Sequence, residues 1–356
     1  DAKTGWLCDV FIVLNSTFSC TSYCLLTGTW VTTGLIELFG NPFKTKETFV
    51  IFNMMAIVAF VYVPLCLLRD LNSLRHVSMV GVCCTLVGVL FVAIEALVYW
   101  DVALPERMCG ASANCTSPEI LKAHLFVPTS QQLLVFNMCC GMLLLHYNIP
   151  KFFAEYHSHD ARDFNRTTFW GTIISMSTGC FMAVVSILRF GTGFPDGNVL
   201  SRFDGPELSN FERKVTMLIW LVMATNVTAN FPILFQPMRS SVLQLCGTSV
   251  EALSITSYTA VTLGLLAFNV FCGLVVPNLT VIMKFKGSIC GIGLSFILPG
   301  AMLWGSLKRR GSHNKFEAQM AAVVFVIGAL LCTYGVVVGI VAVVDLSQRN
   351  STGPSS

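Results

Sequence analysis

The sequence predicts an all-α integral membrane protein, a bundle of helices that crosses the bilayer many times. Apolar residues make up 54% of the 356 residues and charged residues only 12%, well below the roughly 25% of soluble domains. The apolar residues form continuous blocks, each longer than the roughly 18 residues that cross a bilayer as a helix. The blocks lack the alternation of barrel strands. Helices are therefore the spanning structure that this sequence predicts.

Nine blocks are predicted to be transmembrane helices. They cover residues 6–33, 49–68, 77–100, 131–150, 168–190, 215–238, 253–276, 287–306 and 320–344. The whole chain, residues 1–356, then forms one transmembrane domain. Residues 101–130 form a polar loop in it, and residues 345–356 form a short polar tail.

Positive charge predicts the orientation of these spans. The loop 307–319 is the most basic short loop, and basic loops favour the cytoplasm. Nine alternating spans then place loop 101–130 and the tail outside the cytoplasm. A glycosylation sequon at Asn114 lies in this outer loop and agrees with that side. The basic residues of loop 191–214 disagree with it.

The cysteines do not indicate a metal site. There are fifteen, most of them lie inside apolar blocks, and no CxxC pair has a matching second pair. Cys109 and Cys115 differ because both lie in the outer loop. They can form a disulfide there if that side is oxidising and if their geometry allows it.

Catalytic and nucleotide-binding motifs are absent from the sequence. There is no HExxH, no GxxxxGK[ST], no Ser/His/Asp order and no pair of carboxylates within the spans. The net charge of +3 does not indicate a nucleic-acid partner. We expect no enzyme activity, no cofactor, no metal and no nucleic acid, and we expect a lipid bilayer as surroundings.

Three spans carry unusually many polar residues, namely the first, the fourth and the sixth. Such residues can bond neighbouring helices or line a path for a polar solute, and the sequence leaves both readings open. Gly287, Gly291, Gly293, Gly335 and Gly339 indicate close packing of helices. The polar residues are Asn15, Ser16, Thr17, Ser19, Thr21, Ser22, Tyr23, Asn137, His146, Thr225, Thr228 and Asn230.

Several ordered motifs resemble the amino acid/auxin permease family, which includes sodium-coupled neutral and vacuolar amino acid transporters. The fourth span ends with a histidine and a proline, and a glutamate follows it, in the family's order; the sixth span ends with two prolines. These motifs are His146, Pro150 and Glu155; Phe190-Gly191; Pro232 and Pro237; Val276-Pro277-Asn278; and Phe296 to Pro299. An earlier segment from Pro64 to Asp70 also resembles the family.

The resemblance implies a leucine-transporter-like fold, in which two inverted five-helix repeats are followed by one extra helix. The nine spans then correspond to the family's helices three to eleven, and the bundle is incomplete because helices one and two are missing. In this fold the broken first helix supplies half of the substrate site.

The implied function is secondary active transport of amino acids, coupled to sodium or to protons. The implied location is the plasma membrane or a vacuolar or lysosomal membrane. A membrane sensor that binds amino acids without transporting them, or a non-functional fragment of a transporter, are the alternatives.

The resemblance also gives candidate site residues. The family's sixth helix unwinds near its middle, so we expect residues 131–150 not to form a continuous helix. Phe136, Asn137 and Gly141 are the substrate-binding candidates of this span. Ser19 and Ser22 of the first span complete the substrate set, and Thr225, Thr228 and Asn230 of the sixth form the ion-binding set.

The orientation gives a first testable prediction. We expect Asn114 and the C-terminal tail on the non-cytoplasmic side, because the basic loop 307–319 anchors the opposite face. For a protein in the plasma membrane, an epitope inserted at Ser355 should be reached by antibody on intact cells. An epitope reached only after permeabilisation would contradict this orientation.

Overall fold

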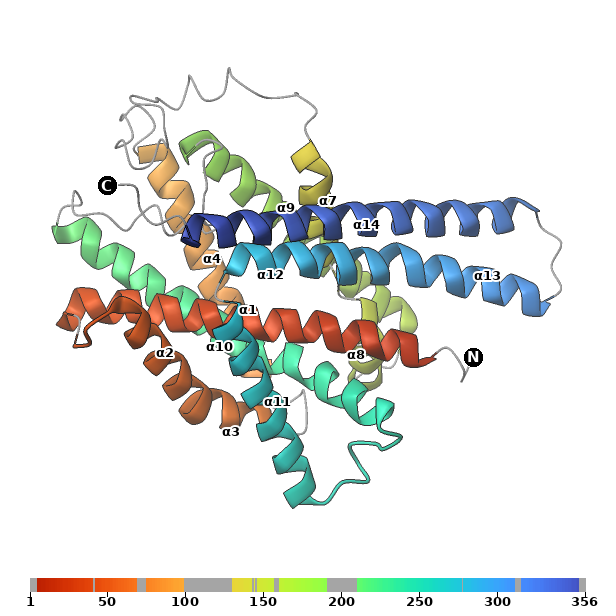
Figure 1. Ribbon diagram of the computed structural model, residues 1–356, viewed down its shortest axis with the longest axis horizontal. Coiled ribbons are helices and arrows are strands. Elements are labelled where there is room, and N and C mark those ends of the chain that lie inside the picture. Colours follow the sequence, from red (N-terminus) through yellow and green to blue (C-terminus); the bar gives the residue numbers. More distant parts are fainter. Residues whose placement is uncertain are drawn as a thin grey trace. The chain divides into compact units, whose positions relative to one another are not determined.

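The computed structural model is built from helices (Figure 1), which confirms the predicted all-α fold class. No strand occurs within the part of the chain that it describes. That part covers residues 5–40, 42–68, 75–98, 130–142, 144, 146–156, 160–190, 210–276, 278–310 and 315–351.

Eight helices of the described chain are long and apolar enough to cross a membrane, which confirms a multi-pass membrane protein. Five of them are single α-helices: α1 (Gly5–Phe39), α4 (Arg75–Val98), α9 (Ala161–Phe190), α10 (Asn210–Leu245) and α11 (Ile255–Val275). The last helix is α14 (Lys315–Ser351). The two others contain π-helical turns: α2 (Lys46–Ile57) continues into α3 (Val63–Cys66), and α12 (Leu279–Phe285) continues into α13 (Leu298–Arg310).

Several observed helices extend beyond the predicted spans, whereas α11 lies within its span. Helix α9 begins at Ala161 rather than 168, and α14 continues to Ser351 rather than 344. Hydropathy marks only the part of a helix that lies in lipid, so polar ends are missed. The largest difference is at α12, which begins at Leu279 rather than 287, because Lys284 and Lys286 interrupt the apolar run.

The fourth predicted span is broken, as expected. Helix α7 (Ser130–Met142) ends one residue after Gly141, and Leu144 is not helical. A 3₁₀ turn follows at His146–Asn148, and the short helix α8 (Ile149–Glu155) comes next. The prediction that residues 131–150 do not form one continuous helix is confirmed.

Two of the π-helical stretches lie just before a proline. The stretch Val58–Tyr62 precedes Pro64, and the stretch Gly293–Ile297 precedes Pro299. A proline ring clashes with the carbonyl four residues earlier, and a wider turn relieves that clash. By contrast, α10 continues through Pro232 and Pro237 without a break.

The chain divides into two compact units, and we describe each by itself. Unit 1 contains residues 1–25, 128–148 and 233–356, and unit 2 contains residues 26–127 and 149–232. In unit 2 the ring of Tyr62 stacks on Phe231 at 3.8 Å, and its hydroxyl lies 2.7 Å from the Thr27 hydroxyl. Helix α4 packs against α9 in this unit.

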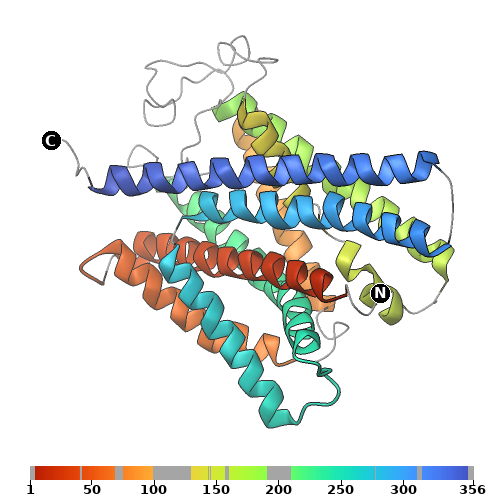
Figure 2. The ribbon, with the colours of Figure 1, turned by 45° about the vertical axis from the view of Figure 1, so that its right-hand side comes forward.

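Unit 1 is held together by two close helix pairs. Helices α13 and α14 lie side by side in both ribbon views (Figures 1 and 2). The second pair is α7 with the π-helical stretch Lys286–Gly291, which we label η5. Glycines allow both approaches, because a Cβ on Gly300 would lie 3.1 Å from the Ala321 carbonyl oxygen.

The contact between α7 and η5 brings two backbones together. A Cβ on Gly287 would lie 2.6 Å from the Asn137 carbonyl oxygen, and a Cβ on Gly291 would lie 2.8 Å from the Gly141 Cα. Only glycine fits at such distances. Gly293, Gly335 and Gly339 also have close neighbours within unit 1, so the predicted role of these glycines in close packing is confirmed.

This contact gives a second prediction. Gly287→Ala should lower the free energy of unfolding by about 1–3 kcal/mol, because overpacking forces the backbone to shift. The thermal unfolding midpoint in detergent measures the effect. Gly264→Ala is the matched control, because no atom lies within 4 Å of its added Cβ. A control midpoint that falls as far as that of Gly287→Ala would contradict the role of the contact.

Candidate functional site

The break after α7 lies inside unit 1 and not in an exposed loop. Leu144, the described residue between α7 and the 3₁₀ turn, is buried against Leu294 and Leu298. Phe11 of α1 and Tyr147 of the 3₁₀ turn pack against the same cluster. Irregular backbone at membrane depth is tolerated where protein covers it or where it lines a cavity, and this break is covered.

A polar face of α1 meets the residues that follow the break. Its members recur at helical spacing, so they lie on one side of the helix; they are Asn15, Ser16, Ser19, Cys20 and Tyr23. The first four are buried. The Tyr147 hydroxyl faces Ser16 and Asn15, and Cys20 and Tyr23 lie within electrostatic range of it. Hydroxyl and amide groups from α1 and from the broken span therefore gather here.

A cation lies beside the same break. Lys286 is the first residue of η5 and is partly buried. A Cβ on Gly141 would lie 3.6 Å from the Lys286 carbonyl carbon, so the backbone of Lys286 runs along the end of α7. Its ammonium is within electrostatic range of Cys20 and Cys290.

Lys286 was missed from the sequence. The predicted span began at residue 287, which left the lysine outside the membrane. The signal was present, because apolar residues flank it on both sides, from Leu279 to Met283 and after Gly287. A lysine between two apolar runs can lie inside one longer helix.

The substrate candidates of α7 have different surroundings. Asn137 is fully buried and donates from Nδ2 to the Leu331 carbonyl oxygen of α14, at 3.0 Å. Phe136 is 44% exposed, and its ring centroid lies 6.2 Å from that of Phe296. Gly141 contacts the backbone of Gly287. Backbone packing therefore accounts for a glycine at position 141, and a larger side chain there would displace η5.

Asn137 and Ser288 form a small buried polar cluster in unit 1. The Ser288 hydroxyl is fully buried, and both it and the Asn137 Nδ2 lie close to Gly335, where a side chain would overlap them. Within the described chain, the Asn137 Oδ1 and the Ser288 Oγ have no hydrogen-bond partner. Ser288 has no counterpart among the predicted site residues, because a lone serine in an apolar block carries no motif.

The two predicted serines of α1 bond to their own helix. The Ser19 hydroxyl donates to the Asn15 carbonyl oxygen at 2.8 Å, and the Ser22 hydroxyl donates to the Phe18 carbonyl oxygen at 2.7 Å. Each hydroxyl keeps lone pairs that can accept a further hydrogen bond. Ser19 lies on the polar face described above.

The three predicted ion-binding residues lie on α10, within unit 2. The Thr225 and Thr228 hydroxyls donate to the Leu221 and Ala224 carbonyl oxygens at 2.9 and 2.8 Å. The Asn230 amide donates to the Asn226 side-chain oxygen at 2.8 Å. Asn230 follows Thr228 by two residues, which places it on another side of the helix. The structure does not bring these three side chains together.

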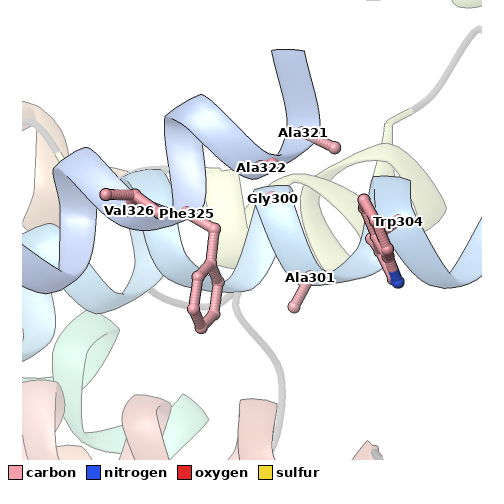
Figure 3. A pocket seen from close by; sticks show the side chains of 7 residues that line it. All are labelled: Gly300, Ala301, Trp304, Ala321, Ala322, Phe325 and Val326. Atoms are coloured by element: carbon pink, nitrogen blue, oxygen red, sulfur yellow. The ribbon is translucent and has the colours of Figure 1, made fainter. Parts of the chain in front are cut away.

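Two cavities occur in unit 1. One of about 350 Å³ lies between α13 and α14 (Figure 3). Its wall contains Gly300, Ala301, Trp304, Ala321, Ala322, Phe325 and Val326. Apart from the Trp304 indole, no side chain there offers a polar group to a zwitterion. The second, of about 650 Å³, has Thr17, Thr21 and Asn278 as its polar residues among apolar ones from α1, α11, α12 and α14.

Several predicted features lie outside the described residues. These are Asn114, Cys109 and Cys115, together with nearly all of loop 101–130. Among the described residues, no group of three or more His, Cys, Asp or Glu side chains could hold a metal ion.

Comparison with known proteins identifies what the chain resembles as a whole. The sequence model of the family described as "Transmembrane amino acid transporter protein" matches residues 2–341. Vacuolar amino acid transporter 5 of Schizosaccharomyces pombe is 24% identical over 305 residues, which cover 85% of this chain. Sodium-coupled neutral amino acid symporter 2 of Danio rerio is 24% identical over 79% of this chain. Amino acid transporter AVT6B of Arabidopsis thaliana is 22% identical over 79%.

The chain is shorter than these relatives. The matched regions span 66% of the S. pombe protein, 56% of the D. rerio protein and 59% of the A. thaliana protein.

Proposed function

Because the chain belongs to the transmembrane amino acid transporter family, we propose that it carries amino acids across a membrane by secondary active transport. The break after α7 is the observation that carries this proposal. A helix interrupted at membrane depth exposes backbone groups that a continuous helix would satisfy internally. Interrupted helices of this kind form substrate sites in secondary transporters.

The chemistry around the break suits a zwitterion. The last turn of α7 ends in carbonyl groups with no partner in the helix, and this end carries negative partial charge that attracts an ammonium group. The polar face of α1 and the Tyr147 hydroxyl add neutral donors and acceptors. Apolar residues of the Leu144 cluster lie beside them. An amino acid with a small or apolar side chain fits these surroundings best.

The proposed substrate region therefore lies in unit 1. It includes Asn137 and Ser19 of the predicted set, with Phe136, Gly141 and Ser22 as residues that shape the helices around it. Tyr147 and Ser16 join them on the contacts described above.

Coupling to sodium or to protons is the second part of the proposal. Thr228 remains the ion-binding candidate of unit 2, because its hydroxyl donates to Ala224 and keeps its lone pairs for a cation. Thr225 has the same local bond but is exposed, and Asn230 is already bonded to Asn226. The D. rerio relative is named a sodium-coupled symporter, whereas the name of the S. pombe relative places it in the vacuole.

Reconstitution tests the proposed function. The purified protein in liposomes should accumulate radiolabelled neutral amino acids when an inward gradient of sodium or protons is imposed. Liposomes without protein, and liposomes without a gradient, are the controls. Binding without accumulation under either gradient would favour a sensor, and the absence of both would overturn transport.

Thr228 gives a third prediction. Thr228→Val removes one hard oxygen donor of the kind that sodium prefers. For sodium-driven uptake, the sodium concentration at half-maximal rate should rise by about tenfold, the equivalent of about 1.4 kcal/mol. Thr333→Val is the matched control, because its hydroxyl makes the same bond within α14, to Ala329 at 2.8 Å. An unchanged sodium dependence in Thr228→Val would remove this residue from the ion site.

A further inference from the structure

Lys286 is an ionisable residue at membrane depth. It belongs to the continuous apolar span Leu279–Arg310. Its neighbours place it away from the span's ends, because Gly141 lies in the middle of the fourth predicted span and Cys20 in the middle of the first. A lysine in this position is costly unless it pairs with an opposite charge or serves a polar path.

No acidic residue in the described part of the chain neutralises this lysine. Within the described chain, the Lys286 ammonium has no carboxylate partner, and the groups within electrostatic range of it are the thiols of Cys20 and Cys290. An ammonium has three donors and no acceptor. An anion is therefore the missing partner, and none of the described residues supplies one.

The end of α7 is a partial counter-charge. The backbone of Lys286 runs along Gly141, one residue before α7 ends at Met142. Carbonyl groups at a helix C-terminus attract cations, but the interaction is weak compared with a full ion pair. The carbonyl groups at the end of α7 therefore do not replace a full counter-charge for Lys286.

We propose that Lys286 binds the α-carboxylate of the transported amino acid, between the end of α7 and the polar face of α1. Tyr147 and Ser16 supply hydroxyl groups next to the same face. A fixed positive charge disfavours amino acids with cationic side chains, and the apolar Leu144 cluster favours aliphatic ones. The assignment rests on the proposed transport function and narrows its substrates to neutral aliphatic amino acids.

Lys284 provides a matched control. It lies two residues before Lys286 in the same span, which turns its side chain to another side of the helix, and both lysines are partly buried. Replacing either lysine by methionine removes one charge and keeps an unbranched side chain. Only the replacement of Lys286 should affect the carboxylate.

The experiment measures how each variant distinguishes an acid from its amide. The full chain in detergent is titrated with L-alanine, L-leucine and L-arginine, and with alaninamide and leucinamide, which lack the carboxylate. The unaltered protein and Lys284→Met should bind L-alanine and L-leucine at least about tenfold more tightly than the amides, as expected for a charge-assisted hydrogen bond. L-Arginine should bind more weakly than L-leucine.

Lys286→Met should lose the preference for acids over amides. Without the ammonium, its affinity for L-alanine and L-leucine should fall to the affinity for their amides. Lys286→Arg keeps the charge and should retain part of the preference. A structural role alone would weaken acids and amides equally. Equal binding of acid and amide by the unaltered protein would overturn the assignment even if Lys286→Met failed to fold.

The possible results distinguish the role of Lys286 in carboxylate binding from the transport function on which that role rests. An unaltered protein that binds none of the probes would overturn the assignment, and uptake of other amino acids into liposomes would then decide the transport proposal. An acid preference that survives in Lys286→Met would overturn the assignment and leave the transport proposal standing.

Discussion

Backbone contact between α7 and η5 is the constraint on which the rest of unit 1 depends. Gly141, Gly287 and Gly291 allow this contact, since the missing side chains leave space for the opposing main chain. Without a hydrophobic force between helices in lipid, close packing of this kind drives their association. The contact fixes Lys286 beside the end of α7 and encloses Asn137 and Ser288. The glycine contact thus holds the polar groups of Lys286, Asn137 and Ser288 in place by backbone packing.

The break in α7 and the π-helical turns of the Leu279–Arg310 span support each other. Both distortions leave backbone groups that a regular helix would bond, and both occur where these two spans meet. Lipid offers no replacement partners. The polar face of α1 lies against the residues after the break and offers them. In unit 2 the candidate ion ligands bond within their own helix, and the π-helical stretch Val58–Tyr62 lies in a different span.

The sequence predicted the fold class and eight of the long helices, since length and hydropathy are local signals. The resemblance to the permease family predicted an interruption within residues 131–150, and α7 ends there at Met142. The sequence also predicted close packing at Gly287 and Gly335. Lys286 and Ser288 were not recognised as site residues, although the apolar residues on both sides of Lys286 indicate a longer span. Their roles depend on which helices become neighbours, and charge alone assigned Lys286 to a loop. The bonds of Ser19 and Ser22 to their own helix likewise appear only in three dimensions.

Hydrogen exchange followed by mass spectrometry tests the central claim that an amino acid binds at the break. Without substrate, the amides of Leu144 and residues 146–148 should exchange much faster than those of the regular helix α14, because they are not part of a continuous α-helix. Saturating L-leucine should slow their exchange and leave α14 unchanged. Exchange at these residues that is already as slow as in α14, or that L-leucine leaves unchanged while another segment becomes protected, would contradict the account.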